Sequence, residues 1–181
     1  MKIRPAVRLL VCGNYHRRDD GAALRAVSRL SARLREGRCI IDITRCGQLD
    51  VQHLLDVPAG DAVVLLDAAV GVAPGEVVVR QLDELIDNPS GAAPHSSHVL
   101  PANLVLGMAN VLAERPIRGY FVGIGGADFG YGDGLSAPVR RALPAFQERI
   151  VEAVIRLTIE ANLGPDVPAD AGPGLAARSV A

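Results

Sequence analysis

The sequence has few aromatic residues, with three tyrosines, three phenylalanines and no tryptophan among 181 residues. Because 49% of the residues are hydrophobic, the core must be built from Val, Leu, Ile and Ala side chains. The three cysteines, Cys12, Cys39 and Cys46, include no CxxC pair. Such a set argues against a disulfide-rich scaffold and indicates a reducing compartment.

Long apolar runs and an excess of one charge are also absent. No run approaches the ~20 residues of a membrane-spanning helix, and the apolar segment at the start is too short for a signal peptide. The formal net charge is −1, with acidic and basic residues interspersed. Neither nucleic acid nor an anionic membrane is therefore expected as a partner. We expect a cytoplasmic globular protein.

Short apolar runs, typical of buried strands, alternate with segments of helical periodicity. Strands are expected at 7–13, 39–44, 61–70, 76–82 and 117–126, and helices at 21–36, 49–56, 100–112 and 135–161. This alternation predicts an α/β fold, a three-layer sandwich whose central twisted, mostly parallel sheet carries helices on both faces. We expect residues 1–161 to form a single domain and residues 162–181, rich in Pro, Gly and Ala, to be a disordered tail.

Several acids and histidines are expected at the carboxyl edge of this sheet, where ligands bind in such folds. Asp19 and Asp20 follow the first strand, Asp67 lies near the end of the third, and His95 and His98 close a loop before a helix. Asp19 is best interpreted as an N-cap. Asp67, within the run VVLLDAAV, is costly to bury unless a cation or several donors meet it.

Two carboxylates and one imidazole suit a borderline divalent ion such as nickel, zinc or ferrous iron. Three protein ligands leave coordination positions open for substrate or water. Competing motifs are missing, since the sequence contains no GxGxxG, no GxxxxGK[ST] and no GxSxG elbow.

Four segments, taken in order, make the sequence similar to the hydrogenase maturation endopeptidases: VCGNYHRRDDG, DAVVLLDAAVGVAPGEV, SSHVLP and FVGIGGADFGYGDGLSAPV. The resemblance runs from about Val7 to about Ala153. It implies a peptidase that removes a short C-terminal extension from the large-subunit precursor of a nickel–iron hydrogenase after nickel insertion. That precursor is the expected partner.

The resemblance also implies the site. Asp20, Asp67 and His98 match the metal-contacting residues of the family, and Asp20 and Asp67 are the expected catalytic acids of an aspartic-type or metal-directed endopeptidase. The ligands recognise nickel carried by the substrate, so no permanently bound cofactor is implied, although zinc or cadmium could occupy the site. Arg45, His95 and Asp128 lie where loops should line the substrate groove and are candidates for specificity.

Two alternatives use the same residues differently. A nickel-dependent chaperone would recognise the immature subunit without cutting it. A metal-dependent small-molecule hydrolase would need an enclosed apolar pocket beside the acids.

Overall fold

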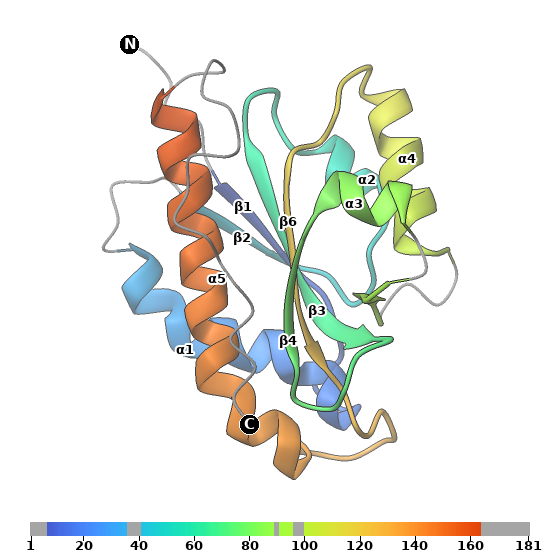
Figure 1. Ribbon diagram of the computed structural model, residues 1–181, viewed down its shortest axis with the longest axis vertical. Helices are drawn as coiled ribbons and strands as arrows, with labels where there is room; N and C mark the ends of the chain where they lie inside the picture. Colours follow the sequence, from blue (N-terminus) through green and yellow to red (C-terminus); the bar gives the residue numbers. More distant parts are fainter. Residues whose placement is uncertain (1–6, 36–40, 89–90, 96–99, 164–181) are drawn as a thin grey trace.

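A computed structural model of the chain describes residues 7–35, 41–88, 91–95 and 100–163. Within these residues a six-stranded sheet passes through the middle of the molecule, as Figure 1 shows. The strands are β1 (Val7–Val11), β2 (Ile41–Arg45), β3 (Ala62–Val70), β4 (Val77–Gln81), β5 (Ala93–Pro94) and β6 (Gly119–Gly125). Their order is β2-β1-β3-β6-β4, and β5 pairs with β3.

The sheet is mixed, with a parallel centre. Strands β2, β1, β3 and β6 pair in parallel, whereas β4 is antiparallel to β6 and β5 is antiparallel to β3. A parallel pair needs a crossover of a dozen or more residues, and the stretch from Gly71 to Glu76 is too short to provide one. The chain therefore turns back after β3, and β4 runs in the opposite direction. The predicted α/β fold is confirmed.

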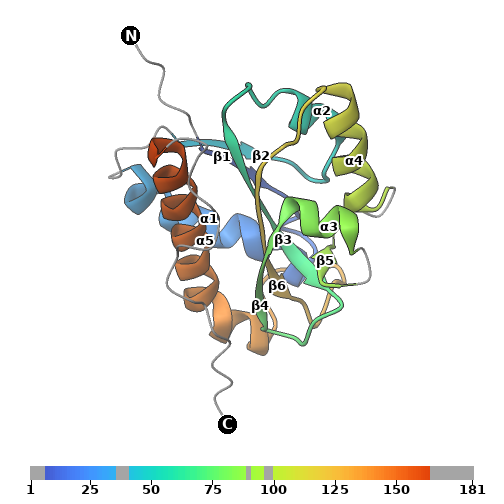
Figure 2. The ribbon, with the colours of Figure 1, turned by 45° about the horizontal axis from the view of Figure 1, so that its top comes forward.

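Helices cover both faces of the sheet, as the turned view in Figure 2 shows. They are α1 (Ala22–Arg35), α2 (Val51–Leu55), α3 (Leu82–Asp87), α4 (Ala102–Leu112) and α5 (Ala137–Leu163), with a short 3-10 turn, η1 (Arg18–Gly21). Helices α1 and α5 pack on one face, and α2, α3 and α4 lie on the other. Each face buries its own aliphatic cluster, with Phe146 in the first and Phe121 in the second.

Besides the η1 turn, two elements were not expected from periodicity. Helix α3 is short, and its start is marked by the Gln81 N–H group, which donates to Glu84 Oε2 at 3.2 Å. Strand β5 has only two residues and lies in a segment whose composition predicts a loop.

Helix α5 ends at Leu163, and the rest of the predicted disordered tail lies outside the described residues. Across the part of the chain that the structure describes, none of the helices has the length and hydrophobicity needed to cross a bilayer.

Candidate active site

Asp67 is an acid inside the central strand. Its side chain is fully buried in β3, and the residue pairs in register with Gly123 of β6. Its Oδ1 accepts a hydrogen bond from the Ala68 N–H group at 2.8 Å. Desolvating a carboxylate inside a sheet is costly, and aliphatic packing does not offset that cost. This position is therefore a functional candidate.

Asp20 is also buried and reaches the same edge of the sheet from η1. Its residue is 4% exposed, and the η1 turn is closed by the Asp20 N–H group, which donates to the Arg17 carbonyl at 2.9 Å. Close packing against the end of β1 depends on Gly13, whose φ is +114°. A Cβ atom on Gly13 would lie 1.9 Å from the Asp20 carbonyl oxygen, so only glycine fits.

His95 lies beside Asp20. Its Nε2 is 3.9 Å from Asp20 Oδ1, and its ring stacks on Phe129 with the ring centroids 3.6 Å apart. The His95 N–H group donates to the Ala68 carbonyl at 2.8 Å, which anchors the histidine to the strand that carries Asp67. The sequence placed His95 at this edge of the sheet and suggested it as a specificity residue. The structure brings it next to one of the two predicted acids.

Asp19 has a different role from the predicted N-cap. It is fully buried and accepts hydrogen bonds from three distant backbone N–H groups. Its Oδ2 accepts from Ala127 at 2.8 Å and from Asp128 at 2.9 Å, and its Oδ1 accepts from Ser136 at 2.7 Å. The prediction was wrong because these donors are more than 100 residues away and the local sequence gives no sign of them. Asp19 instead holds the loop between β6 and α5 against η1.

An ion pair also joins η1 to the loop between β6 and α5. Arg18 forms an ion pair with Asp128, and the Arg18 N–H group donates to the Gly132 carbonyl at 3.1 Å. The Gly130 N–H group and the Arg18 guanidinium together hold the pKa of Asp128 below its usual value. Asp128 is partly exposed, and Arg45, at the end of β2, is exposed. Both therefore remain candidates for contact with a substrate.

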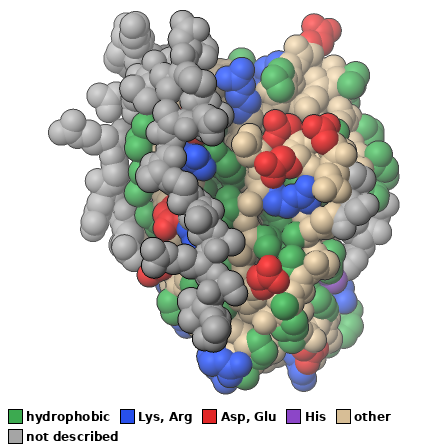
Figure 3. Space-filling view, viewed as in Figure 1, with side chains coloured by type: hydrophobic (Ala, Val, Ile, Leu, Met, Phe, Trp, Pro, Cys, Tyr) green, Lys and Arg blue, Asp and Glu red, His purple; other side chains and the backbone are tan. Residues whose placement is uncertain are grey.

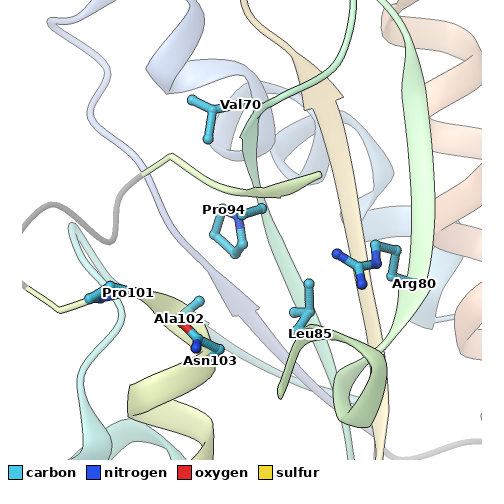
Figure 4. A pocket seen from close by; sticks show the side chains of 8 residues that line it. Val70, Arg80, Leu85, Pro94, Pro101, Ala102 and Asn103 are labelled. Carbon is cyan, nitrogen blue, oxygen red and sulfur yellow. The ribbon is translucent and has the colours of Figure 1, made fainter. Parts of the chain in front are cut away.

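A small cavity of about 200 Å³ lies on the α3–α4 side of the sheet, as Figure 4 shows. It is lined by Val70, Arg80, Leu85, Ala93, Pro94, Pro101, Ala102 and Asn103. Neither Asp20 nor Asp67 is among these lining residues. Ligand pockets usually measure ~300–1,000 Å³. This cavity is therefore not the enclosed pocket beside the acids that a small-molecule hydrolase requires.

Acidic side chains gather close to a basic one on the face drawn in Figure 3. A shallow hollow beside α3 is lined by Arg80, Glu84, Asp87, Asn88 and Gly91. Arg80 donates to the Glu84 and Asn88 carbonyls at 2.7 and 3.0 Å. Since these bonds close the carboxyl end of α3, the role of Arg80 is structural.

The described residues supply two carboxylates and one imidazole to the carboxyl edge. His98, the third ligand predicted from the resemblance, lies outside the described residues. Within the described ranges, no group of three or more His, Cys, Asp or Glu side chains is arranged to hold a metal ion. Carboxylate oxygens such as those of Asp20 and Asp67, together with an imidazole nitrogen such as that of His95, are ligand types that suit a divalent ion such as nickel or zinc.

The fold and these residues define a class, the α/β proteins with buried acids at the carboxyl edge of a parallel sheet centre. The model of the hydrogenase maturation protease family matches residues 24–153, which is more than half of the chain. The chain belongs to this family of peptidases. The match includes Asp67 and His98 and begins just after Asp20. The resemblance drawn from the sequence is confirmed.

Solved structures agree with this assignment. The NiFe hydrogenase maturation protease HybD from Thermococcus kodakarensis is 25% identical, with a TM-score of 0.62, over 81% of this chain and 97% of that chain. The hydrogenase maturating endopeptidase HybD from E. coli is 20% identical, with a TM-score of 0.66, over 83% of this chain and 93% of that chain. The second likeness concerns the fold alone. No curated protein matches this chain by sequence.

Proposed function

We propose that this peptidase removes the C-terminal extension of a nickel–iron hydrogenase large-subunit precursor after nickel has been inserted. Asp20, Asp67 and His98 bind the nickel that the precursor carries, and the protein itself holds no permanent metal. The observation that carries the proposal is the pair of buried carboxylates. Asp20 and Asp67 come from separate segments and reach one edge of the sheet, in a chain whose family model covers residues 24–153.

The chemistry is hydrolysis of one amide bond. The water oxygen becomes part of the new C-terminal carboxylate of the mature subunit, and the leaving nitrogen becomes the amine of the released peptide. One carboxylate accepts the proton of the attacking water and returns it to that nitrogen, which is the aspartic-type role. Binding the substrate's metal beside this carboxylate holds the scissile bond in place, and such positioning can lower the barrier by ~7–11 kcal/mol.

The test uses the precursor prepared with and without nickel. Each form is incubated with the wild-type protein and with Asp20→Asn, Asp67→Asn and His98→Gln, and the intact mass of the precursor is recorded. We expect loss of a C-terminal peptide only with nickel, and a rate lowered roughly 10²–10⁴-fold by either Asp→Asn change. Asp42→Asn is the matched control, because Asp42 is an exposed acid on β2 that pairs with Arg8.

Three other outcomes would each contradict one part of the proposal. Cleavage by Asp20→Asn at the wild-type rate would remove Asp20 from the site. Cleavage of the nickel-free precursor would rule out recognition through the metal. An unchanged precursor mass despite complex formation would favour the non-cleaving chaperone.

A further inference from the structure

Two cysteine thiols face each other at the carboxyl edge of the sheet. Cys12 directly follows β1 and Cys46 directly follows β2, and the last residues of these strands, Val11 and Arg45, are partners in the parallel register. The Cys46 N–H group donates to the Val11 carbonyl at 2.8 Å, which extends the pairing to the cysteines. The two Sγ atoms are 3.6 Å apart.

The surroundings of the pair favour reaction at Cys46. Cys12 is fully buried, whereas Cys46 is 4% exposed and is followed by the exposed Gly47, which has no side chain to cover it. The pKa of Cys46 is lowered chiefly by the hydrogen bond with the Cys12 thiol, although burial and the Asp67 charge act in the opposite direction. The thiolate is the nucleophilic form of cysteine. A small oxidant would therefore meet Cys46 first.

We propose that Cys12 and Cys46 form an oxidisable dithiol that a peroxide converts into an intramolecular disulfide. The Cys46 thiolate attacks one peroxide oxygen and becomes a sulfenic acid, while the other oxygen leaves and is protonated to water. The Cys12 sulfur then attacks the Cys46 sulfur and releases a second water. In total, two thiols lose two protons and two electrons, and one hydrogen peroxide gives two waters. The Sγ atoms must close from 3.6 Å to the ~2.05 Å of a disulfide.

This bond would act on the segment that carries Asp20. Cys12 is covalently joined to Gly13, whose tight contact with the Asp20 carbonyl oxygen leaves no room for a Cβ atom. The Gly13 N–H group donates to the Gly47 carbonyl at 3.3 Å, so this hydrogen bond spans the same two strand ends. Drawing Cys12 and Cys46 together therefore changes the contact that places Asp20. A slower cleavage rate after oxidation would follow, but that consequence rests on the proposed function.

The chemistry is tested on the full chain carrying Cys39→Ser, which keeps only the two cysteines of interest. The protein is treated with hydrogen peroxide, denatured and alkylated, and its intact mass is measured. We expect a mass lower by two hydrogen atoms, no alkyl groups, and recovery of both alkylation sites after treatment with a thiol reductant. Two alkyl groups on the peroxide-treated protein would overturn the proposal. The matched control is the double variant Cys39→Ser/Cys46→Ser, in which Cys12 has no second cysteine with which to form the disulfide.

The link to the site is tested by hydrogen exchange, which does not depend on cleavage. Amide exchange in the peptide covering residues 13–21 is compared between the oxidised and reduced Cys39→Ser protein. We expect a changed exchange rate there, reversed by the reductant, and no change in the double variant under the same treatment. Equal rates in the oxidised and reduced forms would show that the disulfide leaves the Asp20 segment undisturbed. Neither readout changes if the protein proves not to cut a hydrogenase precursor.

Discussion

Two adjacent aspartates in this protein have separate roles. Asp19 directs both carboxylate oxygens at the backbone of the loop between β6 and α5, whereas Asp20 lies beside His95 at the candidate site. Three backbone N–H groups satisfy the Asp19 carboxylate oxygens, which explains how this side chain is tolerated at full burial.

Replacing Asp19 should destabilise the fold. Asp19→Ala leaves the N–H groups of Ala127, Asp128 and Ser136 without their acceptor, and hydrogen bonds to a charged group contribute ~1.5–3 kcal/mol each. We expect the free energy of unfolding to fall by about 3 kcal/mol or more, measured by urea denaturation followed by circular dichroism. The matched control, Asp42→Ala, removes an exposed acid on β2 and should change stability by less than ~1 kcal/mol. Equal stabilities of Asp19→Ala and the wild type would contradict the role given to Asp19.

At the scale of elements, the candidate site depends on how η1 packs against the end of β1. Gly13 lies between them, with a φ of +114° and with the Asp20 carbonyl against its Cα. The Gly13 N–H group donates a hydrogen bond to the Gly47 carbonyl. Unlike Gly13, Gly47 has open space where a side chain would be. The two glycines therefore form a natural pair for comparison.

Gly13→Ala should disturb both stability and the site. The strained backbone alone costs ~1–3 kcal/mol, and the clash with Asp20 adds to it, so we expect a loss of at least about 2 kcal/mol in the free energy of unfolding. Gly47→Ala should change it by no more than ~0.5 kcal/mol. Urea denaturation of both variants provides the measurement. If the two alanines cost the same, the close approach of η1 to β1 is not what requires Gly13.

At the scale of the whole molecule, one sheet separates two aliphatic clusters. Phe146 of α5 is buried in the cluster on the face covered by α1 and α5. Leu106 of α4 is buried in the cluster on the face covered by α2, α3 and α4. Strands β3 and β6 contribute side chains to both clusters, because successive residues of a strand point to opposite faces. Loss of packing on either face should therefore weaken the same cooperative unit.

Phe146→Ala and Leu106→Ala should each shift one shared unfolding transition. The expected losses are ~3–5 kcal/mol for the phenylalanine and ~2–5 kcal/mol for the leucine, since both side chains are almost fully buried. Circular dichroism and tyrosine fluorescence, recorded in the same urea series, should give coincident midpoints. Val111→Ala is the control, because Val111 is 76% exposed on α4 and its loss should change little. Separate midpoints for the two probes would show that the faces unfold independently.

The sequence by itself determined the alternation of strands and helices, the α/β class, the two acids Asp20 and Asp67, and the resemblance to a peptidase family. These features depend on local periodicity, on charge within an apolar run and on short motifs, all of which can be read along the chain. Helix α3 is an exception, because it follows β4 directly and was not predicted from periodicity. Such patterns need no knowledge of distant partners.

Only the tertiary structure decided the role of Asp19, the position of His95 beside Asp20 and the contact between Cys12 and Cys46. The pairing of β4 with β6 rather than with β3 is of the same kind, because the choice of strand neighbour is settled by the whole sheet. In each case the partner is remote in the sequence. A buried carboxylate or thiol is defined by the donors and charges that folding brings to it, and no local pattern encodes them.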